Sequence, residues 1–341
     1  MRFLWKSLQF GYLLLVLFTL FTYLTPFVPP AGWWGFFAVL GLGFPYLFVL
    51  HVVALLVLLW RTSRYGWYAL GVLALGLPFL LRTVNFNATV AAPGQISITT
   101  FNIQILRLHP SDSEESGLER LRRTIGQTDI FCAQELPAVG LPRFHNAFGY
   151  PHRFTQPGVR SAIFSRYPIG ERGVLDLDSE ANDILWADLR IGDRTLRVYN
   201  VHLESNRVSE EVAQLREAGD LRSRETWRTA GEVLRGFSQR AKLRTAQLKT
   251  LRAHIERSPH PVVVMGDFND TPQSYTYRQL SQLLQDGFTK RGSGLGHTYA
   301  GPIPWLRIDY IFASPEIEFQ SYRTHRRVHT DHYPVTARIT L

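Results

Sequence analysis

The distribution of hydrophobic residues divides the 341-residue chain into two parts. Up to about residue 92 the chain consists of three long apolar runs, at about 8–28, 34–60 and 65–83. Each is close to the ~20 residues that a helix needs to span a bilayer, the third being the shortest. From residue 93 onward, short strand-like segments are interspersed with segments of helical spacing. The pattern predicts an all-α transmembrane anchor of three helices in residues 1–92, followed by a mixed domain in residues 93–341.

Basic residues indicate how the anchor would cross the membrane. Arg2 and Lys6 precede the first apolar run, Arg61 and Arg64 lie between the second and the third, and the loop after the first run is uncharged. The positive-inside rule places the N-terminus in the cytoplasm, so three spans would bring the domain to the outer face. Arg82 is on the wrong side for this topology, and if the third run were only interfacial the domain would be cytoplasmic. A cleaved signal peptide is an alternative for the first run, although two more runs follow it.

The charge of the chain limits its partners. Five basic residues and no acid lie in residues 1–92, so only +4 of the formal net charge of +9 belongs to residues 93–341. A mildly basic domain can contact phosphates or anionic lipid headgroups, but it lacks the footprint of a dedicated nucleic-acid binder. The Arg-rich stretch 208–257 predicts two or more helices, broken around Gly219 and Asp220, that face either an anionic surface or solvent. Cys132 is the only cysteine, which excludes an intrachain disulfide.

The stretch 261–270 is the centre of the predicted domain. It begins as a β-branched run typical of a buried strand and ends abruptly in Gly-Asp-Phe-Asn-Asp. Asp267 and Asn269 are two residues apart, so in extended backbone both side chains would point to one face. A carboxylate beside a carboxamide suits the activation of water next to a polar transition state. The alternative is a polar turn, because Asp and Asn are common turn formers.

Other predicted strands also end in polar residues, and their number favours a functional site. Buried charges are costly unless they are paired or bound to a metal. Oxygen ligands without clustered cysteines favour a hard cation, Mg²⁺ or Mn²⁺, and histidines beside carboxylates suit phosphate chemistry. These strand-end residues are Asn102, Glu135, His202, Asp309, Asp331 and His332.

The stretches that carry these residues resemble, in order, the motifs of the endonuclease/exonuclease/phosphatase superfamily, which has the deoxyribonuclease-I-like fold. The matching stretches are 100–104, 134–135, 200–203, 266–269, 307–310 and 330–334. The resemblance covers nearly all of residues 95–341, and the extended stretch 266–277 looks like a bacterial membrane-attached branch. It implies an α+β fold: a four-layer α/β/β/α sandwich of two packed mixed β-sheets flanked by helices.

The resemblance also implies roles for the reacting residues. Asp267 would orient or deprotonate the attacking water, and Asn269 and His202 would donate hydrogen bonds to the phosphoryl oxygens. Asp309 would pair with His332 and support its positive charge near the phosphate.

A second set would hold the divalent metal, Mg²⁺ or Mn²⁺. By resemblance Glu135 would bind the metal, with Asn102 and Asp331 as further ligands. Asn200 would support these residues without binding the metal itself. Gln104 stands where some family members carry an acid, and this neutral amide favours a single tightly held metal.

The resemblance and the anchor together predict a phosphoester hydrolase of the bacterial inner membrane whose catalytic domain faces outward. Its substrate would be a nucleic acid, a lipid headgroup or a small phosphoester, and no protein partner is implied. The modest charge of the domain weakens the nuclease interpretation, and the short 83–94 connection favours a site near the bilayer. A non-catalytic membrane scaffold that retains the fold is the alternative.

Overall fold

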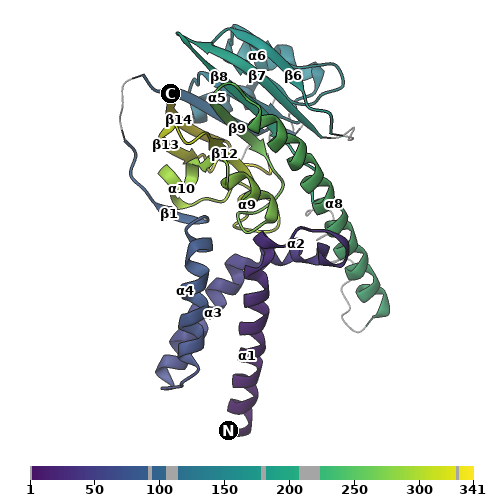
Figure 1. The fold of residues 1–341 in the computed structure, drawn as a ribbon, viewed down its shortest axis with the longest axis vertical. Helices are drawn as coiled ribbons and strands as arrows, with labels where there is room; N and C mark the ends of the chain where they lie inside the picture. Colours follow the sequence, from purple (N-terminus) through teal and green to yellow (C-terminus); the bar gives the residue numbers. More distant parts are fainter. Residues whose placement is uncertain (1, 91–93, 105–113, 178–181, 207–222, 328–329) are drawn as a thin grey trace.

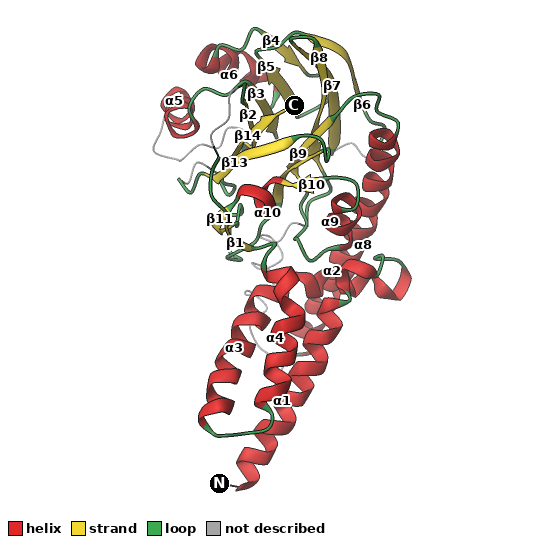
Figure 2. Cartoon of the chain, turned by 60° about the vertical axis from the view of Figure 1, so that its left-hand side comes forward, coloured by secondary structure: helices red, strands yellow, loops and turns green. Residues whose placement is uncertain are grey.

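The computed structural model describes residues 2–90, 94–104, 114–177, 182–206, 223–327 and 330–341. Two six-stranded sheets form the centre of the chain after the N-terminal helices (Figures 1 and 2). The first sheet has the order β10 (Gln285–Asp286), β12 (Asp309–Ala313), β9 (Val262–Asp267), β8 (Arg194–His202), β7 (Asp183–Ile191) and β6 (Ile169–Val174). The second has the order β13 (Glu318–Thr324), β14 (Val335–Thr340), β2 (Ile96–Asn102), β3 (Ile130–Gln134), β5 (Ala162–Ser165) and β4 (His152–Phe154). Both sheets are mixed, because β8–β9 and β2–β3 are parallel pairs among antiparallel neighbours.

The predicted central strand is β9, and it is buried on both sides. Val263 and Met265 lie in the core between the two sheets. Val264 points the other way, into a second core beneath α8 (Arg224–Glu256) and α9 (Tyr275–Ser281). The alternation of side chains along a strand explains this division, and burial on both faces explains why the run contains no polar positions before its end.

Helices also cover the outer face of the second sheet. α5 (Glu114–Ile125) and α6 (Leu141–Phe148) pack there around a third core that contains Phe131 of β3 and Phe144 of α6. Two mixed sheets with a helical layer on each outer face confirm the predicted sandwich.

α8 is one helix of 33 residues in the part of the Arg-rich stretch that is described. The Ser223 hydroxyl caps it by accepting the backbone N–H of Glu225 at 3.1 Å. The helix on the C-terminal side of the expected break is continuous, and an apolar stripe that includes Phe237 and Leu251 stays buried along it. The break expected at residues 219–220 lies outside the described residues.

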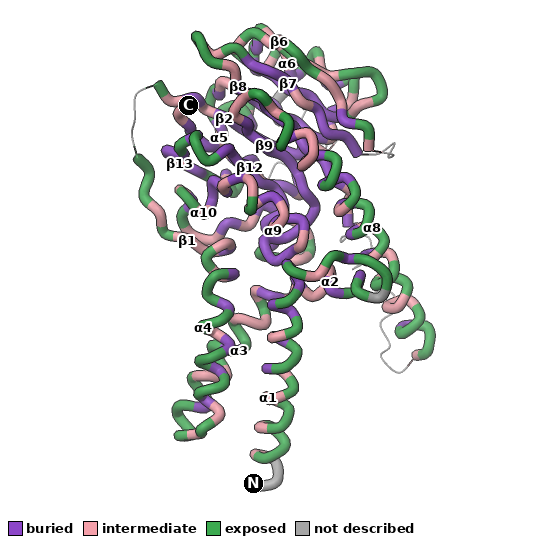
Figure 3. The backbone as a smooth tube through the Cα atoms, viewed as in Figure 1, coloured by how far each residue is buried: buried purple, intermediate pink, exposed green. Residues whose placement is uncertain are grey.

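The N-terminal helices project away from the sheets. α1 (Arg2–Tyr23), α3 (Phe44–Trp60) and α4 (Gly66–Leu80) lie side by side, with the N-terminus at the far end (Figures 1 and 2). Their apolar side chains are largely exposed (Figure 3). By length and composition two segments, Trp5–Phe27 and Trp34–Trp60, could cross a membrane, and the third apolar helix is shorter.

The second apolar run is not one straight helix. η2 (Gly32–Phe36), α2 (Phe37–Leu40) and η3 (Gly41–Gly43) precede α3, and η2 and α2 pack against α8 (Figure 1). A Cβ atom on Gly35 would lie 1.5 Å from the Ser238 hydroxyl oxygen, so the absence of a side chain permits this close approach. The apolar composition of the run therefore serves two surfaces, one along α1 and α4 and one against the sandwich.

The connection after α4 begins as a strand. β1 (Val84–Phe86) pairs with β11 (Ser293–Leu295), which ties the end of α4 to the sandwich. Just before it, the Arg82 guanidinium lies 5.4 Å from the ring centroid of Tyr277 on α9. The N-terminal helices and the sandwich thus share a packed junction.

One glycine in β9 allows the strand to approach its neighbour before Asp267. Gly266 has a φ of 151°, and a Cβ atom there would lie 1.9 Å from the Val201 carbonyl oxygen of β8. We expect Gly266→Ala to lower the free energy of unfolding by more than about 2 kcal/mol, because β8 and β9 would have to separate. Denaturant unfolding of the full chain in detergent would measure this.

Gly170→Ala is the matched control, because a Cβ atom there meets the nearest heavy atom at an ordinary 3.6 Å. Equal stability of the two variants would contradict the close approach described for Gly266.

Candidate active site

The polar ends of three neighbouring strands meet at one edge of the first sheet. Asp267 is the last residue of β9 and lies in register with His202, the last residue of β8. On its other side it lies opposite Asp309, the first residue of β12. All three are buried, and the two aspartates are each 1 % exposed. Strand pairing therefore brings together three residues that are far apart in the sequence.

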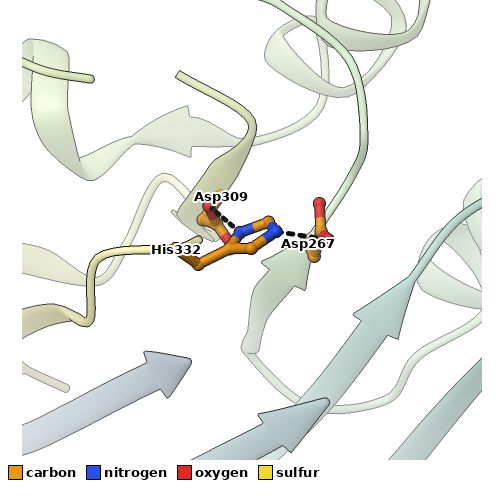
Figure 4. A group of neighbouring side chains, drawn as sticks. All are labelled: Asp267, Asp309 and His332. Carbon is orange, nitrogen blue, oxygen red and sulfur yellow. Dashed lines mark hydrogen bonds and ion pairs between the residues drawn. The ribbon is translucent and has the colours of Figure 1, made fainter. Parts of the chain in front are cut away.

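His332 lies between the two aspartates (Figure 4). Its Nδ1 is 2.9 Å from Asp309 Oδ2, and its Nε2 is 3.7 Å from Asp267 Oδ2. Burial alone would lower the pKa of His332, but the negative charges of Asp309 and Asp267 outweigh it and raise that pKa to about 10. The imidazole is therefore a cation at neutral pH, with Asp309 fixing the orientation of its ring.

The backbone around His332 is held by a neighbouring loop. His332 forms a bridge with Tyr299, and the Ala300 N–H donates to the Asp331 carbonyl oxygen at 2.7 Å. The Tyr299 ring lies edge-on to the imidazole, with centroids 5.8 Å apart. The Thr330 hydroxyl accepts the His332 N–H at 3.0 Å. These contacts place the imidazole without using its nitrogens.

Asp267 is held as an acceptor of hydrogen bonds. The Asn269 backbone N–H donates to its Oδ1 at 2.9 Å, and Asn102 Nδ2 donates to its Oδ2 at 3.1 Å. Burial raises the pKa of Asp267 to about 6, against the opposing effect of the positive charge of His332. The carboxylate is ionised at neutral pH yet basic enough to take a proton.

Asn102 links Asp267 to the second sheet. Besides its bond to Asp267, Asn102 Nδ2 donates to Glu135 Oε1 at 3.0 Å. The Gln104 backbone N–H donates to Asn102 Oδ1 at 3.0 Å, so Gln104 contributes through its main chain. His202 Nε2 is 3.7 Å from Glu135 Oε1. Glu135 has a φ of 53°, the left-handed conformation of a sharp turn directly after β3.

Asn269 faces the loop that follows β8. It has a φ of 51°, and its Nδ2 donates to the Leu203 carbonyl oxygen at 3.0 Å. The Asn206 Nδ2 donates to the Asn269 carbonyl oxygen at 2.6 Å, and the buried Arg244 of α8 in turn donates to Asn206 Oδ1 at 2.6 Å. α8 therefore supports this side of the site through Asn206.

Asn200 joins the two sheets beneath the site. It belongs to β8, yet its Nδ2 donates to the carbonyl oxygens of Ala133 on β3 and Ala162 on β5, both at 2.9 Å. Its Oδ1 accepts a hydrogen bond from Gln134 Nε2 at 2.6 Å. The amide thus fixes one sheet relative to the other.

The structure brings all ten predicted residues to this region, with Asn200 below the others. Sequence reasoning did not assign roles to the residues that hold them in place. Thr298 Oγ1, for example, accepts the backbone N–H groups of both Ile308 and Asp309 at 3.0 Å. Thr298 and Tyr299 lie in a glycine-rich stretch without a strand pattern, so only their closeness in space reveals them. Thr330 and Gln134 were inside recognised motifs, and their position next to site residues was the available signal.

The donor atoms on the Glu135 side fit a divalent cation. Asp331 Oδ1 is buried without a hydrogen-bond partner among the described residues. Burial raises the pKa of Asp331, and the charge of Glu135 raises it further. A cation held by these two carboxylates would remove that cost. Asn102 would offer its oxygen to the cation with its amide group turned over, because here its Nδ2 faces Glu135 and its Oδ1 accepts the Gln104 N–H.

A second group of possible ligands fits a metal less well. Ligand atoms of Asp267, Asp309 and His332 lie within 4.8 Å of one another. Both ring nitrogens of His332 face carboxylates, however, and a protonated imidazole has no lone pair to offer a metal. This trio is better described as a buried acid–base chain in which His332 is hydrogen-bonded to Asp309 and forms an ion pair with Asp267.

Comparisons with known proteins agree with this architecture. A family model described as the Endonuclease/Exonuclease/phosphatase family matches residues 99–332, and another, described as a domain of unknown function, matches residues 5–83. No curated protein matches the chain.

Solved structures share the fold at low sequence identity. A Bacteroides thetaiotaomicron protein of the endonuclease/exonuclease/phosphatase family is 16% identical, with 73% of this chain and 98% of that chain covered and a TM-score of 0.53. The endonuclease/exonuclease/phosphatase from Bacteroides vulgatus is 17% identical, with 72% and 99% covered and a TM-score of 0.54. TDP2 from Caenorhabditis elegans is 16% identical, with 72% and 74% covered and a TM-score of 0.50. Identities this low establish the fold alone.

The raised pKa of His332 predicts how stability depends on pH. Its folded-state value of about 10 exceeds the ordinary 6.5, so its contribution is present below about pH 6.5 and is lost as pH rises through about 10. We expect the free energy of unfolding to fall by a few kcal/mol between pH 7 and pH 10, measured by denaturant unfolding in chelator.

Asp309→Asn should flatten this fall, because His332 loses its principal charge partner. Asp193→Asn, in an exposed turn, is the matched control and should keep the slope of the wild type. An equally steep fall in Asp309→Asn would contradict the assignment.

Proposed function

Because the chain belongs to the endonuclease/exonuclease/phosphatase family, we propose that it is a membrane-anchored, divalent-metal-dependent phosphoester hydrolase. Family members are generally hydrolases of phosphoester bonds and typically depend on a divalent metal. The observation that carries the proposal is the buried chain Asp309–His332–Asp267, which lies beside the carboxylate and amide of Glu135 and Asn102.

In the proposed reaction Asp267 acts as the base. It orients a water molecule and takes its proton as the water oxygen bonds to phosphorus and the ester P–O bond breaks. The departing oxygen takes up a proton from solvent, and Asp267 returns its own to solvent. A pKa of about 6 leaves Asp267 ionised at neutral pH while keeping it a useful base.

Hydrogen-bond donors and positive charge would stabilise the transition state. His332, held as a cation by Asp309, lies where it would neutralise charge on the phosphoryl oxygens. His202 and the second N–H of the Asn269 amide are the further proposed donors. These donors lie at strand ends and in tightly held turns, so their side chains would need to move little to bind the phosphoryl oxygens in the transition state.

Glu135, Asn102 and Asp331 are the proposed metal ligands. A bound Mg²⁺ or Mn²⁺ would offset the negative charge that develops on the phosphate and the leaving oxygen. Asn200 and Gln104 would hold Asn102 and the two sheets in place. The neutral side chain of Gln104 adds no charge for a second metal.

We further propose that the anchor crosses a bacterial inner membrane with the sandwich on the outer face. The basic residues of the positive-inside rule lie together at the far end of the anchor, where Arg61 stacks 5.0 Å from the Trp5 ring centroid and Lys6 and Arg64 line one cavity. Arg82 has a separate role in the junction, where it also donates to the Pro272 carbonyl oxygen at 3.3 Å. It therefore does not count against this orientation.

The activity is tested with the full chain in detergent and a generic phosphodiester such as bis(p-nitrophenyl) phosphate. We expect hydrolysis that needs Mg²⁺ or Mn²⁺ and falls by about 10²–10⁴-fold in Asp267→Asn and His332→Ala, because each removes a group that acts in the transition state. Product release is followed by absorbance.

Controls separate loss of chemistry from loss of metal or fold. Asp193→Asn should keep full activity, and Mn²⁺ titration followed by electron paramagnetic resonance should show weaker binding in Glu135→Gln than in Asp267→Asn. Metal-independent or mutation-insensitive turnover would contradict the mechanism, and absence of turnover would favour a non-catalytic scaffold.

The orientation predicts the location of the C-terminus. A reporter fused after Leu341 should be active only on the outer side, because an odd number of crossings separates it from a cytoplasmic N-terminus. Alkaline phosphatase and green fluorescent protein fusions, which are active on opposite sides, form a matched pair. Fluorescence with no phosphatase activity would reverse the proposed topology.

A further inference from the structure

The loop that follows β9 joins the candidate site to the anchor. Within six residues of Asp267, Gln273 Nε2 donates to the Phe79 carbonyl oxygen at 3.3 Å and to the Thr83 hydroxyl at 3.2 Å. A Cβ atom on Gly41 would lie 3.5 Å from the Gln273 carbonyl oxygen. The loop that begins with the proposed base therefore ends against η3 and the end of α4.

The loop that precedes Asp309 makes a second connection. The Tyr46 hydroxyl of α3 donates to the Pro304 carbonyl oxygen at 2.7 Å, and its ring stacks on Trp305 with centroids 5.4 Å apart. Leu42 of η3 packs against an apolar cluster that contains Tyr299. Tyr299 also contacts His332, so a single small cluster separates the anchor from the proposed catalytic imidazole.

With the anchor orientation proposed above, these contacts set the depth of the site relative to the membrane. α3 has 17 residues, which span about 25 Å at 1.5 Å per residue and so nearly cross a hydrocarbon core of about 30 Å. Arg61 and Arg64 follow its far end. Its near end, at Phe44, therefore lies at the opposite interface. The residues that touch the site loops, Leu42 and Tyr46, lie at that same level.

Side chains around the junction are typical of the headgroup region. Trp34 and Trp305 are 57 % and 38 % exposed there, as expected of an interfacial aromatic belt. Nearby, a groove of about 630 Å³ lies between the loop at residues 29–32 and α8, with Lys242 and Lys249 among its lining residues. These aromatic and basic groups suit lipid carbonyls and phosphates.

We propose that the substrate is a phosphoester carried by a membrane lipid, hydrolysed while the lipid stays in the bilayer. The proposal rests on the hydrolase function and the anchor orientation proposed above. With the anchor in a bilayer, a lipid phosphate at the interface would lie at the level of Leu42 and Tyr46, one apolar cluster away from His332. A long nucleic acid would instead have to enter between the sandwich and an anionic membrane surface, where like charges repel.

Pairs of substrates with the same headgroup test the proposal. The full chain in lipid nanodiscs is given phosphatidylglycerol, phosphatidylethanolamine, cardiolipin or phosphatidic acid, and separately the deacylated, water-soluble form of each. We expect kcat/KM to be at least about 10-fold higher for one or more lipids than for the matched soluble form, because the bilayer concentrates the substrate at the site. Asp267→Asn provides the background, and mass spectrometry identifies the products.

Bis(p-nitrophenyl) phosphate and plasmid DNA in the same assay separate the possible failures. If Asp267-dependent hydrolysis of these or of the deacylated forms equals or exceeds that of every lipid, the lipid proposal is overturned and the hydrolase function stands. If none of the substrates is hydrolysed although Mn²⁺ binds, both proposals are overturned. The full chain is needed because removing the anchor would uncover the apolar surfaces around Tyr299 and Tyr277.

Discussion

Two carboxylates, Asp267 and Asp309, are buried opposite each other on neighbouring strands, and a cationic imidazole lies between them. Like charges in a buried site repel strongly, and removing one member of such a group leaves an uncompensated charge. The surrounding structure serves this arrangement. The backbone bridge between Tyr299 and His332 positions the imidazole, and the register of β9 and β12 positions the two aspartates. Asn200 holds the second sheet beneath them. The site and the sandwich therefore depend on the same set of contacts.

The strands and the polar residues at their ends could be predicted from local patterns in the sequence, whereas the sandwich and the roles of the site residues were implied by the family resemblance of the ordered motifs. β9 is predicted by its β-branched run, and Asp267, the residue that ends the strand, is buried, which raises its pKa to about 6. His202 and Asp309 are found by the same reasoning, since pairing in register needs no knowledge of distant loops. The order of the motifs along the chain then identifies the family, which 16–17% identity to the solved structures would not by itself suggest.

Other features could not be predicted, for identifiable physical reasons. Thr298 and Tyr299 act through backbone pairing in an irregular loop, which leaves no periodicity in the sequence. The division of the second apolar run into η2, α2 and α3 could not be predicted for another reason: hydrophobicity indicates that a surface is removed from water but not whether lipid or protein covers it. Gly35 lies where protein covers the run, but the need for a glycine there comes from the close approach of Ser238, about 200 residues further along the chain.

The junction between anchor and sandwich has a kinetic consequence. β1 pairs with β11, Gly35 meets Ser238 and Tyr46 stacks on Trp305, so three separate contacts restrain rotation of the sandwich about the anchor axis. With the proposed topology and lipid substrate, an enzyme fixed in this way would encounter its substrate in one leaflet by lateral diffusion alone. Its turnover would then follow the surface mole fraction of its substrate. Diluting the vesicles in buffer would leave the rate per enzyme unchanged, whereas diluting the substrate with inert lipid would slow it.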